Sequence, residues 1–173
     1  MLAKLLPRWL RRGEDSFRDA HPAVTSEQEI TYQPHLITEL QADHRELLRL
    51  FRELVVAHRM GDVAVCLAKL KRFTHSLRAH LLRENLHLYA YLSQSLSNDP
   101  ESSELMVQMR REMQTIGRAL NEFATRYTAT TWNASLREAL SMELDHIAEI
   151  LDHRITHEEN NLYPLYMPPG AYR

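Results

Sequence analysis

Residues 80–92 read HLLRENLHLYAYL, and residues 154–166 read RITHEENNLYPLY. Each stretch places a glutamate four residues before the pair Leu-Tyr, and each lies in a run of apolar residues at helical spacing. The stretches differ four residues before the glutamate, where His80 precedes Glu84 and Arg154 precedes Glu158. The repeat predicts two helices with equivalent polar positions, one holding a neutral imidazole and the other a permanent cation.

Outward from these stretches, apolar residues at helical spacing predict four long helices, over residues 31–59, 63–96, 100–127 and 134–163. Between them lie Gly61 with Asp62, the run Ser-Asn-Asp-Pro at 97–100, and Asn133. Long amphipathic helices with short connections are typical of an all-α, antiparallel up-and-down four-helix bundle. We expect the domains to be an N-terminal amphipathic arm and linker (1–30), the bundle (31–167) and a C-terminal tail (168–173).

The composition disfavours several classes of protein. A chain of 173 residues that is 44% apolar can form one domain with a core, and its formal charge of −2 gives no global attraction for nucleic acid. The single cysteine, Cys66, can form no internal disulfide, and no apolar run approaches the roughly 20 residues of a membrane span. No Gly-rich phosphate loop or catalytic triad pattern stands out. We expect a cytoplasmic protein that is not an enzyme and binds no nucleic acid.

Several polar residues fall on the apolar faces of the predicted helices. At about 100° per residue, Glu84 and Glu158 lie about 20° from the centre of their apolar stripes, and His80 and Arg154 about 60° from it. His44 falls in the apolar stripe of the first helix. A buried glutamate is costly unless it is paired or bound to a metal. The pattern therefore predicts a polar cluster inside the bundle, with functional atoms within roughly 10 Å.

The chain resembles the hemerythrin-like (HHE cation-binding) domains over about residues 34–166. The resemblance rests on Asp43-His44, His80-x-x-x-Glu84 and Glu158-Glu159-x-x-Leu162-Tyr163-Pro164. It implies a metal site with a histidine from helix one, a His-x-x-x-Glu from helix two, a histidine from helix three and a second His-x-x-x-Glu from helix four. The metal ligands that it implies in this chain are His44, His80, Glu84 and Glu158. The helix-three histidine falls near Met113, and the helix-four histidine falls on Arg154.

The two substituted positions leave three states of the site open. Methionine is a poor ligand for iron and arginine cannot bind a metal, so an intact di-iron centre is the least favoured. Two imidazoles and two carboxylates suffice for a single iron ion, or for zinc. Alternatively, Arg154 replaces the metal's charge in a metal-free network with Glu84 or Glu158. A weaker resemblance of this Arg-x-x-x-Glu ending, to the regulators of sigma D, implies metal-free binding of a sigma factor.

The fourth helix also carries a rival pair of ligands, His153-x-x-x-His157, with His146 on the same side. These three histidines fall about 200–240° from Leu151, opposite the core. We expect a solvated face, and as the alternative an adventitious metal site or partner site.

Two functions follow from these alternatives. The first is a non-enzymatic hemerythrin-like sensor or regulator that uses a partially retained iron site, and the resemblance suggests oxygen, nitric oxide or iron status as its signal. The second is a metal-free four-helix interaction module that binds a protein partner such as a transcription factor.

The N-terminal arm predicts a contact surface. Its first twelve residues, MLAKLLPRWLRR, place five large apolar residues at helical spacing and carry a local charge of about +4. On the outer face of helix two, Leu82, Leu86 and Tyr89 form a second apolar stripe. We favour docking of the arm on such a stripe, in its own bundle or in a homo-oligomer, over contact with an anionic membrane and over disorder.

Overall fold

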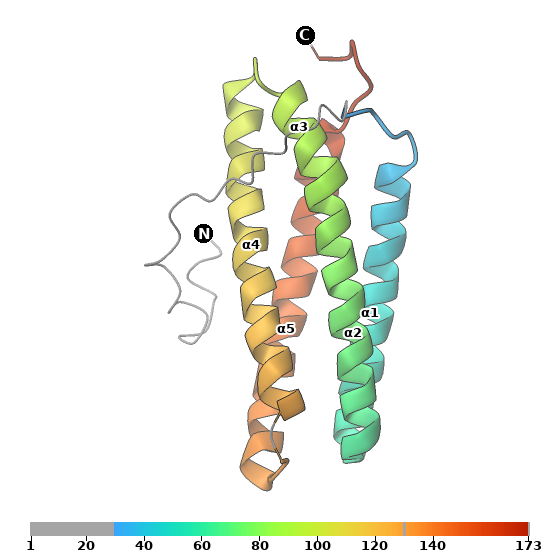
Figure 1. Cartoon of the computed structure of the whole chain (residues 1–173), viewed down its shortest axis with the longest axis vertical. Coiled ribbons are helices and arrows are strands. Elements are labelled where there is room, and N and C mark those ends of the chain that lie inside the picture. Colours follow the sequence, from blue (N-terminus) through green and yellow to red (C-terminus); the bar gives the residue numbers. More distant parts are fainter. Residues whose placement is uncertain (1–29, 130, 173) are drawn as a thin grey trace. The chain divides into compact units, whose positions relative to one another are not determined.

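Four long helices lie side by side in the computed structural model, which describes residues 30–129 and 131–172 (Figure 1). They are α1 (Leu36–Met60), α2 (Val63–Arg83), α4 (Pro100–Ala129) and α5 (Ala134–His157). Two of them continue into short segments, α2 into η2 (Glu84–Tyr89) and α3 (Ala90–Ser95), and α5 into η3 (Glu158–Leu162) and η4 (Tyr163–Leu165). Successive long helices run in opposite directions, which confirms the predicted antiparallel four-helix bundle. Except for Ile30, the predicted arm lies outside the described residues.

Local signals set most of the helix ends. The side chain of Asp62 accepts a hydrogen bond from the Val65 backbone at 3.0 Å, and that of Asn133 accepts one from Leu136 at 2.8 Å. Gly61 ends α1 with a φ of 77°, a left-handed conformation that costs glycine little. The start of α1 differs from the prediction, because a turn through Pro34 delays the helix to Leu36.

The polar positions lie between two apolar parts of the core. One contiguous cluster packs α1, η2, α3 and α4 against η3, η4 and the residue that follows η4. It consists of Leu36, Leu40, Leu88, Tyr89, Tyr91, Leu92, Leu96, Met106, Met109, Met113, Leu162, Tyr163 and Tyr166. Toward the other end of the helices, the buried side chains include Phe51, Phe73, Phe123 and Tyr127. Burial of these side chains is the main favourable contribution to stability, and it holds the backbone positions around the polar residues fixed.

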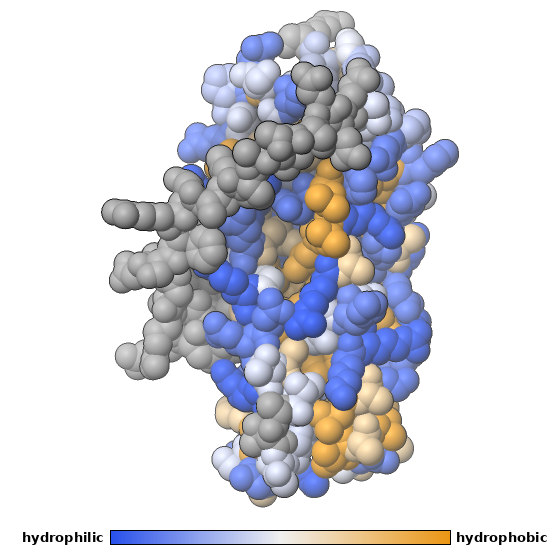
Figure 2. Space-filling model, viewed as in Figure 1, coloured by the Kyte–Doolittle hydropathy of each residue, from blue (hydrophilic) through white to orange (hydrophobic). Residues whose placement is uncertain are grey.

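The surface is largely hydrophilic, with apolar atoms exposed over α2 (Figure 2). Leu82 and Leu86 are 58% and 55% exposed, as the predicted outer stripe requires, but Tyr89 is buried. The prediction was wrong for Tyr89 because it assumed one continuous α-helix. The i→i+5 hydrogen bonds of η2 add a residue to the turn and rotate the positions that follow Glu84. Among the described residues, no helix is long and apolar enough to cross a membrane.

Candidate metal centre

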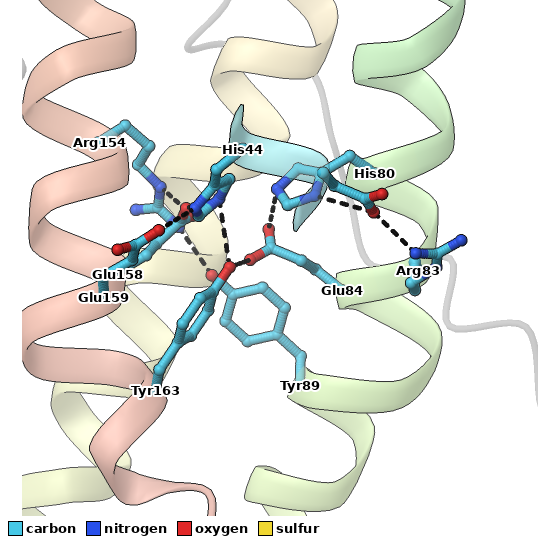
Figure 3. A network of polar contacts seen from close by, with 10 residues as sticks. His44, His80, Arg83, Glu84, Tyr89, Arg154, Glu158, Glu159 and Tyr163 are labelled. Carbon is cyan, nitrogen blue, oxygen red and sulfur yellow. Dashed lines mark hydrogen bonds and ion pairs between the residues drawn. The ribbon is translucent and has the colours of Figure 1, made fainter. Parts of the chain in front are cut away.

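Four potential ligands converge in the interior of the bundle (Figure 3). His44 comes from the middle of α1, His80 from the last turn of α2, Glu84 from the start of η2 and Glu158 from the start of η3. All four side chains are buried, and one ligand atom from each lies within 4.8 Å of the others. This confirms the convergence expected from periodicity.

Two π-helical segments place the two glutamates. Glu84 opens η2 and Glu158 opens η3, so the repeated Glu-x-x-x-Leu-Tyr pattern takes a similar backbone form in both helices. Single-turn π segments inside α-helices are rare and frequently occur at functional sites. The backbone therefore presents the two carboxyl groups equivalently, as the sequence repeat predicted.

Arg154 lies inside the cluster rather than at the surface. Its Nε donates a hydrogen bond to Glu158 Oε1 at 2.5 Å, and its Nη2 donates to the Tyr89 hydroxyl at 2.8 Å. Glu112 Oε2 from α4 is 3.4 Å from Nη1. This confirms the expected contact between Arg154 and a core glutamate. Met113, the other substituted position, is buried in the apolar cluster.

A second layer of polar groups holds the outer atoms of the ligands. His44 Nδ1 is 2.8 Å from Glu159 Oε1, which leaves Nε2 facing Glu158 Oε2 at 3.2 Å. The Tyr163 hydroxyl lies 3.2 Å from both His44 Nε2 and Glu84 Oε1. Carboxylates that hold the far nitrogen of a histidine are typical partners of metal-binding imidazoles.

Sequence reasoning quoted Glu159 and Tyr163 in the family motif but assigned them no role. Their positions relative to Glu158 could have indicated a role. Glu159 directly follows this core glutamate, and Tyr163 lies five residues after Glu158. Asp43, named in the same motif, was likewise given no role, but its Oδ2 lies 3.6 Å from His80 Nδ1 and accepts a hydrogen bond from Arg83 at 2.8 Å. Asp43 directly precedes the core residue His44.

Burial and charge set the protonation of the cluster. Burial raises the pKa of Glu84 well above its ordinary value, and the nearby charge of Glu158 raises it further. Burial also opposes ionisation of Glu158, but hydrogen bonding to His44 and the charge of Arg154 outweigh it and lower the pKa of Glu158. Burial would lower the pKa of His44, but its contacts with Glu158 and Glu159 raise it. The metal-free site therefore favours the neutral form of Glu84 and the ionised form of Glu158.

Two buried atoms of the cluster make no hydrogen bond. Neither Glu84 Oε2 nor His80 Nδ1 has a hydrogen-bond partner among the described residues, although Glu84 Oε2 lies 3.8 Å from His80 Nε2 and Asp43 Oδ2 lies 3.6 Å from His80 Nδ1. A buried polar atom without a partner costs about 1–3 kcal/mol. The ligands of one iron or zinc ion lie at most about 4.4 Å apart, which is twice a bond of about 2.2 Å. The observed spread of 4.8 Å exceeds this limit by about 0.4 Å, so a single cation would draw the four donors slightly together. The unsatisfied oxygen of Glu84 is free to be one of these donors.

The neutral Glu84 predicts a pH dependence of the metal-free protein. Because its folded pKa is raised, the folded chain keeps a proton that the unfolded chain releases near its ordinary pKa of about 4.3. The free energy of unfolding should therefore fall as the pH rises above that value, because unfolding then releases the proton that the folded chain holds. His44 acts in the same direction above about pH 6.5.

Urea unfolding of the metal-free protein at a series of pH values measures this effect. Glu84→Gln reproduces the neutral carboxyl, so this variant should be the more stable protein at pH 8 and should lose the part of the pH dependence due to Glu84. Identical pH profiles for the two proteins would contradict the assigned protonation.

The rival histidines stay apart from the cluster. His153 is exposed, and its ring stacks on that of His157 with the centroids 6.0 Å apart. His146 and His157 are half-buried, so this face is solvated only in part. Among the described residues, the only group of three or more potential ligands is the one around Glu84.

Comparisons with known proteins agree with this geometry. The family model for the hemerythrin HHE cation binding domain matches residues 35–166, which include all four converging residues and both substituted positions. No curated protein and no solved structure gives a match.

Proposed function

We propose that this chain, which belongs to the hemerythrin HHE cation binding domain family, is a non-enzymatic sensor or regulator that holds a single iron ion in its core. The observation that carries the proposal is the convergence of two imidazoles and two carboxylates, one of them with an unsatisfied buried oxygen. Mixed nitrogen and oxygen donors suit Fe(II) and also Zn(II), so zinc is the alternative metal. Iron would supply the redox and ligand-binding chemistry from which a signal is read.

The chain's own residues would position the donors and limit the site to one ion. Glu159 contacts Nδ1 of His44, and Arg154 donates a hydrogen bond to Oε1 of Glu158. These contacts leave Nε2 of His44 and Oε2 of Glu158 facing the cluster. The guanidinium of Arg154 already supplies a positive charge beside Glu158 and would repel a second cation. Met113 stands where the resemblance implies a histidine on helix three. The four potential ligands that remain are enough for one ion but too few for two.

The network also connects the core to the surface, which a sensor requires. Glu159 and Asp43 are about one-third exposed, and Glu112 on α4 is one-fifth exposed. Metal binding would ionise Glu84, change the charge of the cluster and alter the hydrogen bonds of η2 and η3. A ligand can report a signal only if it favours one of two such states.

Hydrogen exchange tests the sensor proposal. Loading with Fe(II) under anaerobic conditions should slow the exchange of amides in η2 and η3, and exposure to oxygen or nitric oxide should change it again. The first turns of α5, far from the cluster in the chain, serve as the internal control, and Glu84→Gln as the matched variant. A different result is that the protein binds Fe(II) and yet shows the same amide exchange in η2 and η3 before loading, after loading and after exposure to oxygen or nitric oxide. That result would contradict a sensor and argue for passive metal storage.

A metal-free interaction module is the second candidate, and the ion pair between Arg154 and Glu158 favours it. This pair already neutralises one of the two buried carboxyl groups, and protonation neutralises the other. The bundle would then act through its surface on a protein partner such as a transcription factor. The two candidates differ in metal content, which elemental analysis after loading with Fe(II) measures.

A further inference from the structure

We propose that a cleft between α2 and α4 binds a small amphipathic anion, a carboxylate on a short alkyl chain, and that its occupancy is transmitted to the polar cluster through Tyr89. Binding in the cleft does not depend on the proposed function. Only the effect on metal affinity rests on it.

The cleft has the size of a small ligand. Its volume is about 280 Å³, and its walls come from the end of α2 with η2 on one side and from α4 on the other. This is about nine times the volume of roughly 30 Å³ that one water molecule occupies in the liquid, so a molecule of roughly ten non-hydrogen atoms fits. Gly117 helps to keep the cleft open because it has no side chain. A Cβ at this position would already be in van der Waals contact with the side chain of Leu81, at 3.6 Å.

The lining is mostly apolar but contains one cation that forms no ion pair within the described part of the chain. Leu81, Leu82 and Met113 provide apolar surface, and the exposed Leu82 lies at the solvent side. Arg110 also lines the cleft, and its Nε is buried without a hydrogen-bond partner among the described residues. None of the lining residues is acidic, so nothing in the lining would repel an anion.

These features together select the class of ligand. A buried guanidinium nitrogen without a partner costs free energy, and a carboxylate is the group that pairs with it most strongly. An alkyl chain would cover Leu81, Leu82 and Met113, together with apolar surface that is now exposed over α2 (Figure 2). The basic segment of residues 1–12 is a poorer match, because its four positive side chains would add charge near Arg110.

Tyr89 joins the cleft to the polar cluster. Its side chain lines the cleft, and its hydroxyl accepts the 2.8 Å hydrogen bond from Arg154 (Figure 3). A ligand packed against the Tyr89 ring would shift this hydroxyl and with it the guanidinium that pairs with Glu158. Metal affinity and anion affinity should therefore change each other by the same factor.

Titration of the full-length, metal-free protein with octanoate, followed by calorimetry, tests the binding. Arg110→Gln should weaken octanoate binding by about tenfold or more, because a charge-assisted hydrogen bond is lost. The neighbouring, exposed Arg111 gives the matched control, and Arg111→Gln should leave the affinity unchanged. Gly117→Leu should abolish binding by filling the cleft, and 1-octanol should bind equally to the wild type and to Arg110→Gln.

Equal octanoate affinity in the Arg110 and Arg111 variants would overturn the proposal, as would binding that survives Gly117→Leu. The coupling is tested separately, since saturating octanoate should shift the Fe(II) affinity of the wild type and not that of Tyr89→Phe. An unchanged Fe(II) affinity in the wild type would overturn the coupling. Failure to bind Fe(II) at all would instead contradict the proposed function and leave the octanoate result standing.

Discussion

Arg154→Ala should lower the free energy of unfolding of the metal-free protein by about 3–5 kcal/mol, the usual cost of breaking a buried ion pair from one side. The substitution leaves Glu158 without its 2.5 Å partner and Tyr89 without its hydrogen-bond donor. It also removes a positive charge that opposes the rise of the Glu84 pKa. Urea unfolding at neutral pH measures the loss.

Two controls separate this effect from the loss of any arginine. Arg83→Ala breaks the half-exposed pair with Asp43 and should cost no more than about 1 kcal/mol. In a Glu158→Gln background the cost of Arg154→Ala should shrink, because no buried charge is left unpaired. A cost of Arg154→Ala similar to that of Arg83→Ala would show that the buried network does not depend on the guanidinium.

The double variant Arg154→His with Met113→His should raise the capacity for iron from about one ion per chain to about two. It removes the cation beside Glu158 and adds two imidazoles, which restores His-x-x-x-Glu on α5 and places a histidine on α4. Six side-chain donors match the ligand set of the family, whereas four match one ion. Anaerobic titration with Fe(II), followed by desalting and elemental analysis, gives the stoichiometry.

Each single variant should stay near one ion, because either substitution alone leaves the second position short of ligands. A double variant that folds and still binds no more iron than the wild type would contradict the assignment of Met113 and Arg154 as the substituted ligand positions.

The sequence was sufficient for the fold because its signals are local. Asp62 and Asn133 cap the helices that follow them, and Pro100 begins α4, so three boundaries could be read from single residues. The periodicity of apolar residues predicted the inward faces, and with them the convergence of the four potential ligands. These positions were correct because each lies within α-helical geometry or at the first residue of a π segment.

The details that the sequence missed depend on departures from a regular helix and on neighbours in space. Tyr89 turned inward because η2 changes the helical period after Glu84. The sequence left the partner of Arg154 open between Glu84 and Glu158, and the packed bundle shows that the guanidinium pairs with Glu158. Glu112 lies on another helix, and no local pattern indicates that α4 would bring it to Arg154.

The metal content of the protein distinguishes an iron site from a metal-free network. The chain is purified without a histidine tag, loaded with Fe(II) under anaerobic conditions, desalted and analysed for iron and zinc beside Glu84→Gln. We expect about one ion per chain in the wild type, as for a site with four donors. Glu84→Gln should lose most of the metal, although we expect it to be the more stable protein without metal. A wild type that retains no more metal than Glu84→Gln would rule out the site and favour a metal-free network around Arg154.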